Sequence, residues 1–390
     1  MPEGRRFFAA QAWIAGGWAR DVLLVASKDG RWAEVRAGVG QADRAGAEVL
    51  PGPLLPGVVD GHSHAFQRAM AGLAERSPAG RDDFWGWRDR MYAAALRITP
   101  PQLEAIATFL YAELLQAGYT QVCEFHYLHN DLDGRSYADP LEMSLALVRA
   151  ARSAGIGLTL LPTLYMRSGF AAAGLREDQR RFASTPESVL RIAQAVRKLG
   201  AGDPTLTAGI AIHSLRAVDA GALREAAQAA RAAGMPVHIH IAEQQLEVDD
   251  CIARHGRRPI EWLLEQGLLD AGWNLVHATH AGVAELQGVQ RSGAAIVLCP
   301  STEANLGDGV FDLPAWLAAG GRWSVGSDSH VTRSWLEELR QLEYSSRLVL
   351  RQRNVAARAS GREATAAVLV GAAARGGGAG AGPPARGPAP

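Results

Sequence analysis

From Pro56 onward, short apolar runs alternate with Ala- and Leu-rich amphipathic stretches. The runs have the length of buried strands and the stretches have helical spacing, which is the pattern of a parallel sheet with helical crossovers. The expected strands are 57–61, 120–124, 158–164, 207–213, 236–242, 274–278, 295–299 and 323–327. Helices are expected near 101–117, 140–154, 186–199, 219–233, 258–268, 281–291, 313–319 and 334–350. Eight such units predict an α/β fold, a (β/α)8 TIM-type barrel whose active site lies at the C-terminal ends of the strands.

The main competing topology is an open, doubly wound sheet. That fold usually carries a Gly-rich phosphate-binding loop after its first strand, and no such loop follows residues 57–61. We therefore assign residues 56–365 to a barrel.

The two ends of the chain have other patterns. Strand-like runs at 7–15, 20–26 and 31–36 are separated by hairpin-type turns, so residues 1–55 are expected to form the N-terminal part of a small β-sandwich-like domain. Residues 371–390 contain only Gly, Ala, Arg and Pro, a composition that predicts a disordered, low-complexity tail.

Charge and cysteine content limit the class of partner. The 40 Lys and Arg residues balance 40 Asp and Glu residues, and no long basic run occurs, so neither nucleic acid nor an anionic membrane is expected as a partner. A small-molecule substrate fits better. The cysteines, Cys123, Cys251 and Cys299, are odd in number and far apart, which favours reduced thiols in a cytoplasmic protein.

Histidines are concentrated at the ends of the predicted strands. His62 and His64 are two residues apart, and alternate side chains of a strand point to the same face, so both imidazoles can bind one metal ion. Two polar residues in a loop would be the ordinary explanation for either histidine alone. Histidines occur at the ends of several strands of one predicted barrel, so a metal site explains them better than separate loop positions do.

Three later strands supply the remaining groups. His238 and His240 share a face of the fifth strand, and Glu243 follows it as a possible general acid or base. The sixth strand ends near His277, and Asp328 follows the eighth as a possible oxygen ligand.

These motifs have a familiar order. Pro-Gly-Val-Val-Asp-Gly-His-Ser-His, His-Ile-His-Ile-Ala-Glu, Leu-Val-His-Ala-Thr-His and Gly-Ser-Asp-Ser-His resemble the metal and proton-transfer motifs of deaminases in the amidohydrolase superfamily. Within it, His-Ala-Phe-Gln-Arg, Phe-Trp-Gly-Trp-Arg, Glu-Phe-His-Tyr and Ser-Thr-Glu-Ala-Asn-Leu-Gly-Asp-Gly are similar to those of N-formimidoyl-L-glutamate deiminases. The resemblance implies hydrolysis of N-formimidoyl-L-glutamate to N-formyl-L-glutamate and ammonia in histidine degradation, and it is compatible with a homodimer.

The resemblance also implies roles for individual residues. One Zn²⁺ per subunit would be held by His62, His64, His240 and Asp328, a ligand set that suits zinc. Proton handling and activation of a water molecule would fall to Glu243, His277 and Asp328. The substrate contacts would be Gln67, Arg88, Tyr127, His213 and Arg216.

The substrate itself gives a chemical check on this set. N-formimidoyl-L-glutamate has a cationic amidine and two carboxylates, and guanidinium groups such as those of Arg88 and Arg216 match carboxylates in paired hydrogen bonds. For Arg88 the ordinary alternative is a surface salt bridge, and for Tyr127 it is packing.

Two other functions stay open. A related metal-dependent deaminase could act on a heterocycle such as guanine, although a neutral purine would not require both arginines. The tail, residues 371–390, suggests instead the product of a damaged gene. Relatives continue into strands that complete the small β domain. A shifted reading frame in a GC-rich gene would yield Gly, Ala, Arg and Pro. Such a product would be C-terminally damaged and inactive.

Overall fold

The computed structural model describes residues 4–28, 30–75 and 84–380, which fall into two compact units divided after Gly57. The N-terminal unit is one four-stranded sheet in the order β3-β2-β1-β4, formed by β1 (Arg6–Ile14), β2 (Gly17–Ala26), β3 (Trp32–Arg36) and β4 (Glu48–Val49). The three strands expected here are present, and the two-residue β4 was not expected. Alternation along β2 sends Val22 and Leu24 to one small apolar cluster and Leu23 to another, so both faces of the sheet are apolar.

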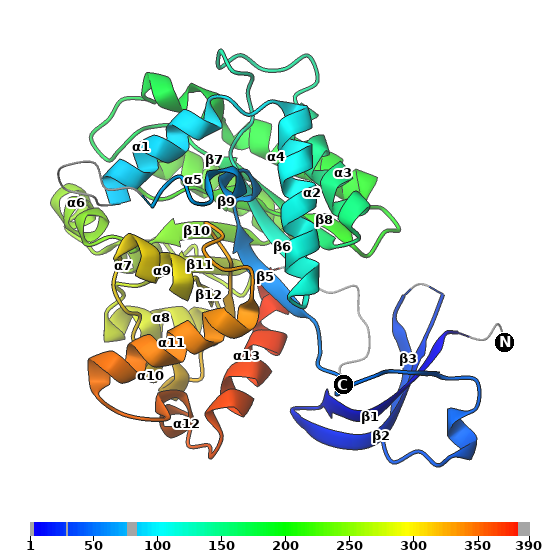
Figure 1. Cartoon of the computed structure of the whole chain (residues 1–390). Helices are drawn as coiled ribbons and strands as arrows, with labels where there is room; N and C mark the ends of the chain where they lie inside the picture. Colours follow the sequence, from blue (N-terminus) through cyan, green and yellow to red (C-terminus); the bar gives the residue numbers. More distant parts are fainter. Residues whose placement is uncertain (1–3, 29, 76–83, 381–390) are drawn as a thin grey trace. The chain divides into compact units, whose positions relative to one another are not determined.

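The second unit contains a parallel barrel (Figure 1). Its strands are β5 (Val58–Ser63), β6 (Tyr119–His126), β7 (Gly157–Leu164), β8 (Leu206–Ala208), β9 (Ile210–Ile212), β10 (Val237–Ile241), β11 (Trp273–His277), β12 (Ala295–Leu298) and β13 (Arg322–Val325). The short strands β8 and β9 both pair with β7 and together occupy the fourth position. A parallel bridge between Ser63 and Asp328 joins the first strand position to the last. All eight expected strands are therefore confirmed.

Helices surround the strands (Figure 1). The expected ones are α2 (Pro100–Gln116), α3 (Glu142–Ala154), α4 (Pro186–Leu199), α5 (Ala220–Ala232), α7 (Pro259–Glu265), α8 (Val283–Ser292), α10 (Leu313–Ala318) and α11 (Trp335–Leu350). Residues 85–90 have a helix-like pattern in the sequence and lie in α1 (Phe84–Ala95). The described residues also contain four helices that were not expected: α6 (Gln245–His255), α9 (Pro300–Leu306), α12 (Val355–Ala359) and α13 (Thr365–Gly380). Helices α6 and α9 follow β10 and β12.

Helix α13 corrects the expectation of disorder from residue 371. The helix continues to Gly380, and it buries Leu369 and Ala373 completely or nearly so against the barrel. Composition predicted disorder because the segment offers little apolar surface, but its alanines favour helix and its small side chains allow close packing on the strands. Residues 381–390 lie outside the described residues.

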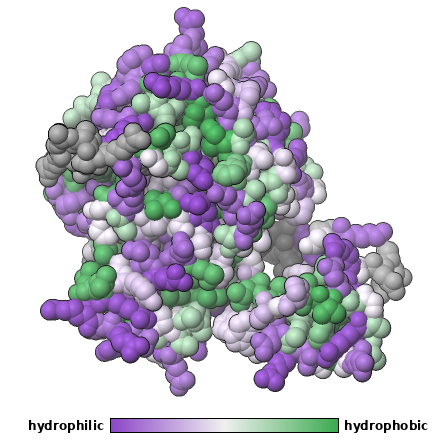
Figure 2. Space-filling model, viewed as in Figure 1, coloured by the Kyte–Doolittle hydropathy of each residue, from purple (hydrophilic) through white to green (hydrophobic). Residues whose placement is uncertain are grey.

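The surface carries both hydrophilic and hydrophobic side chains (Figure 2), and the thiols are buried. On the face shown in Figure 2, hydrophilic side chains separate the apolar ones into small groups. None of the helices in the described ranges has the length and apolarity needed to cross a membrane. Cys123, Cys251 and Cys299 are buried, free thiols, as the sequence predicted.

Candidate active site

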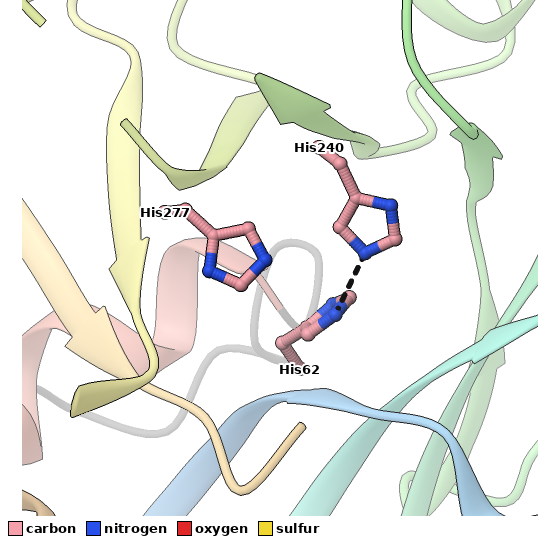
Figure 3. Close-up of side chains that lie close together, drawn as sticks. All are labelled: His62, His240 and His277. Atoms are coloured by element: carbon pink, nitrogen blue, oxygen red, sulfur yellow. Dashed lines mark hydrogen bonds between the residues drawn. The ribbon is translucent and has the colours of Figure 1, made fainter. Parts of the chain in front are cut away.

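Four strand ends deliver a cluster of buried polar side chains to the barrel interior. We call His62, His64, His240, His277 and Asp328 the histidine–aspartate cluster. All five side chains are buried. Figure 3 shows His62, His240 and His277 converging from β5, β10 and β11.

Backbone contact brings Asp328 to the histidines of β5. The Asp328 N–H donates to the His62 carbonyl at 2.9 Å, and the His64 N–H donates to the Asp328 carbonyl at 3.3 Å. This approach requires glycine at position 326, because a Cβ there would lie 2.7 Å from the His62 Cβ. The Gly-Ser-Asp motif therefore serves packing as well as chemistry.

The backbone at these strand ends is strained. His277, Ala278, Asp328 and Ala242 have φ angles of 70°, 52°, 46° and 52°, a region that non-glycine residues seldom adopt. Strain of this kind persists only where the surrounding structure enforces it, and it is concentrated at functional sites.

The ligand atoms of the cluster form overlapping groups, each compact enough to hold one cation. The Nε2 atoms of His62 and His240 are 3.0 Å apart, and the Nε2 atoms of His62 and His64 each lie 3.4 Å from Asp328 Oδ1. Two overlapping groups of candidate metal ligands therefore meet at His62: one with His64 and Asp328, the other with His240 and His277.

The charge state of the histidines fits a metal site. Burial lowers the pKa of His62 to about 4 and that of His64 to about 3, and it lowers the pKa of His240 well below its usual value. Neutral imidazoles offer a lone pair, which a metal ion requires. His64 Nδ1 lies 2.8 Å from the Phe125 carbonyl, which can only accept, so Nδ1 carries the proton and Nε2 the lone pair.

A second arrangement of charges adjoins the cluster. His277 Nε2 lies 3.7 Å from Glu243 and 3.8 Å from Asp328, and its Nδ1 lies 3.3 Å from Glu303. Burial alone would lower the pKa of His277, but the carboxylates of Glu243, Glu303 and Asp328 outweigh it and raise the pKa to about 10. Burial raises the pKa of Glu243 to about 7, against the opposing charges of His277 and Arg216. Opposed shifts in neighbouring groups are typical of acid–base catalysis.

One cavity gathers the residues that the sequence singled out. It is lined by His64, Gln67, Arg88, Tyr127, His213, Arg216, His240, Glu243, His277 and Asp328, and His62 is fully buried beside it. Gln67 Nε2 donates to the Tyr127 hydroxyl at 3.2 Å. His238, by contrast, is buried on the same strand as His240 and does not line the cavity.

Arg88 and Arg216, which we call the arginine pair, occupy this cavity without a close acidic partner among the described residues. Within the described part of the chain, the one carboxylate within 4.0 Å of Arg88 is that of Asp89, at 3.9 Å. Burial would lower the pKa of Arg216, but the more distant charges of Glu247 and Glu243 raise it. Charged, unpaired guanidinium groups in a cavity suit an anionic ligand.

Sequence reasoning missed several residues of the cavity and its surroundings. The wall also contains Phe84, Trp87, Met91, Tyr92, Thr302 and Leu306. Glu303 accepts from the Cys299 N–H at 3.0 Å as well as lying beside His277, so it orients that ring. Thr302, Glu303 and Leu306 belong to the Ser-Thr-Glu-Ala-Asn-Leu-Gly-Asp-Gly motif. Spacing within that motif does not reveal that these residues lie beside the end of another strand.

Comparisons with known proteins are consistent with this geometry. The sequence profile of the amidohydrolase family matches residues 54–370. The formimidoylglutamate deiminase of Pseudomonas aeruginosa is 54% identical over 348 residues, which are 89% of this chain and 76% of that protein. A 5-methylthioadenosine/S-adenosylhomocysteine deaminase of Haloquadratum walsbyi is 26% identical over 76% of this chain and 60% of its own length. The crystal structure of an amidohydrolase from Brucella melitensis superposes with a TM-score of 0.92 at 44% identity, over 98% of this chain and 84% of that one.

Proposed function

Since this chain belongs to the amidohydrolase family, we propose that it catalyses the hydrolytic deamination of N-formimidoyl-L-glutamate to N-formyl-L-glutamate and ammonia. The reaction cleaves the C–N bond of a linear amidine and belongs to histidine degradation. The observation that carries the proposal is one cavity lined by Glu243, by the arginine pair and by four members of the histidine–aspartate cluster.

One Zn²⁺ is the metal that suits this site, with His62, His64, His240 and Asp328 as its ligands. Three neutral imidazoles and one carboxylate with converging ligand atoms support that assignment. Such an ion, when bound, lowers the pKa of a water molecule and polarises the bond under attack.

Glu243 and His277 handle protons in this reaction. Glu243, with a pKa of about 7, can hold a proton and release it to the leaving nitrogen near neutral pH. His277 carries a proton on Nε2, directed toward Glu243 and Asp328, and so donates hydrogen bonds to the oxygen that adds to the amidine carbon. Asp328, whose pKa the surrounding histidines hold below its usual value despite burial, accepts the proton of the attacking water.

The other end of the substrate is recognised by positive charge and hydrogen bonds. Arg88 and Arg216 bind the two carboxylates, each through paired N–H groups. Gln67, Tyr127 and His213 complete the contacts around them. Phe84 and Trp87 close the cavity beside the arginines, which limits water access to the charged groups.

A second candidate function is deamination of a heterocycle such as guanine. The relative of 26% identity is named as a 5-methylthioadenosine/S-adenosylhomocysteine deaminase. The arginine pair argues against it, because a neutral ring would leave two guanidinium groups without partners.

The free thiols fit a cytoplasmic location, and a homodimer is compatible with the fold.

Ammonia release decides between these functions. Metal-loaded protein is incubated in parallel with N-formimidoyl-L-glutamate and with guanine, and ammonia is measured over time. We expect release from the amidine alone. Release from guanine and not from the amidine would replace the proposal with the second candidate, and release from neither would favour an inactive product.

A further inference from the structure

The structure assigns Trp85 the role of a positioning residue that fixes the arginine pair and thereby the separation of the carboxylates that the cavity accepts. This inference rests on the proposed function, because it takes Arg88 and Arg216 as the carboxylate-binding groups. Trp85 itself touches no substrate. Its ring acts through the two guanidinium groups.

The indole of Trp85 contacts both members of the pair. Arg88 Cζ lies 4.5 Å from the Trp85 ring centroid, and Arg216 Cζ lies 5.5 Å from it. Other rings contact one arginine each: Phe84 lies 5.6 Å from Arg216 Cζ, and Tyr92 lies 5.4 Å from Arg88 Cζ. Among the described aromatic residues, Trp85 is therefore the shared one.

Trp85 stands outside the wall of the cavity. Phe84, Trp87 and Arg88, its neighbours on α1, line the cavity, and Trp85 does not. Its side chain is half-buried. A ring in this place can hold the groups that line the cavity and bind the ligand.

Among the residues that the structure describes, no close ion pair orients the two arginines instead. The Arg88–Asp89 contact is long, at 3.9 Å, and the Asp89 side chain is 58% exposed. Within the described part of the chain, Arg88 Nε and Arg216 Nη1 are buried and have no hydrogen-bond partner. Attraction between each cation and the indole can then orient the pair.

Contact with a ring preserves what the arginines need for binding. An aromatic ring attracts a guanidinium without using its N–H groups, so those donors stay available for carboxylates. A salt bridge would occupy the same donors. Because one ring contacts both arginines, it also fixes the distance between the two binding positions, and a dicarboxylate of another length would fit less well.

The test compares Trp85→Leu and Trp85→Phe with wild-type holoenzyme, using N-formimidoyl-L-glutamate and the analogue one methylene shorter, N-formimidoyl-L-aspartate. We expect Trp85→Leu to raise KM for the glutamate derivative by about tenfold or more and to leave kcat within about twofold of wild type. The ratio of kcat/KM for the glutamate derivative to kcat/KM for the aspartate derivative should become smaller. Trp85→Phe should recover part of the loss. The dissociation constant of the product, N-formyl-L-glutamate, measured by calorimetry, should rise in parallel with KM.

A mutant cycle that combines Trp85→Leu with Arg88→Met and Arg216→Met separates positioning from general packing. Trp85→Leu should add little in the Arg88→Met, Arg216→Met background, because nothing remains for the ring to hold. Trp87→Leu removes another α1 ring, one in the cavity wall with no recorded contact to either guanidinium, and its effect should be additive with those of the arginine variants. Additivity for Trp85 would overturn the inference.

The remaining outcomes are also decisive. If Trp85→Leu lowers kcat together with thermal stability, the ring has a structural role and the inference fails. If wild-type protein releases no ammonia from the amidine but binds N-formyl-L-glutamate in a Trp85-dependent way, the proposed function fails and the inference stands. Normal turnover with unchanged KM and dissociation constant in Trp85→Leu removes the inference and leaves the function intact.

Discussion

The histidine–aspartate cluster and the arginine pair share one cavity, but the protein holds them by different means. Cluster residues lie at or just after the ends of parallel strands and are fixed by the backbone, as in the hydrogen bonds that join Asp328 to His62 on β5 and to His64 just after it. Arg88 lies on α1 and Arg216 follows β9, and their charged ends rest on aromatic rings. The cluster is thus a property of the barrel, whereas the pair depends on side chains packed around its mouth.

This difference predicts two kinds of mutational effect. A change in the cluster should remove the metal or stop the chemistry, and a change in the arginine pair should weaken binding without abolishing turnover. Loss of metal in an arginine variant, or weaker binding alone in a cluster variant, would show that the two regions depend on each other.

The largest effect is expected for His240→Ala. Loss of one imidazole should empty the metal site and abolish measurable ammonia release. Elemental analysis beside an ammonia assay checks both parts. His129→Gln is the matched control, because His129 is another buried neutral histidine, bound to the Thr163 carbonyl at 2.9 Å and outside the cluster. A His240→Ala protein with full metal content would remove this residue from the ligand set.

Glu243→Gln separates proton transfer from metal binding in the cavity. The amide keeps the size of the side chain but cannot carry a proton, so turnover should fall by about 10²- to 10⁴-fold while the metal content stays at the wild-type level. Parallel measurement of kcat and metal stoichiometry tests this division of roles. Purification of the variant without metal would mean that Glu243 supports the site rather than moving protons.

Arg88→Met and Arg216→Met come next in size. Each should lower kcat/KM for N-formimidoyl-L-glutamate by about 10- to 150-fold, corresponding to about 1.5–3 kcal/mol for a hydrogen bond to a charged group. The loss should appear mainly in KM, with normal metal content. Steady-state kinetics of the two variants checks the prediction, and wild-type kcat/KM in both would exclude the pair from substrate binding.

Tyr127→Phe should have the smallest effect. The Tyr127 hydroxyl accepts from Gln67 at 3.2 Å and donates weakly to the Met91 sulfur at 3.7 Å. Its loss removes these uncharged contacts, of which the bond from Gln67 is worth about 0.5–1.5 kcal/mol. We expect kcat/KM to fall by about 2- to 10-fold. A fall as large as that for the arginine variants would indicate that Tyr127 belongs with the charged contacts and not with the neutral ones.

The sequence revealed the cluster better than the arginine pair, and the reason is physical. Strand periodicity places His62 and His64 on one face, and a barrel brings all strand ends to one mouth, so spacing alone was informative. Arg88 was found by resemblance, because nothing in the pattern of α1 shows which residues face the cavity. Glu303 escaped notice because its contact with His277 joins a helix to a different strand, and such a pairing exists only after folding.

Composition failed in a comparable way at the far end of the barrel, where residues 371–377 were expected to be disordered. Gly377 faces Val59, on the strand that carries His62, and an added Cβ would lie 2.5 Å from the Val59 Cβ. At Gly376 it would lie 1.5 Å from the Trp323 carbonyl oxygen. Bulk at either position must displace a strand whose other end supports the chemistry. Deep mutational scanning of this helix should therefore show that side-chain volume decides which substitutions are tolerated at these two glycines. Alanine there should reduce function as much as a charged residue does.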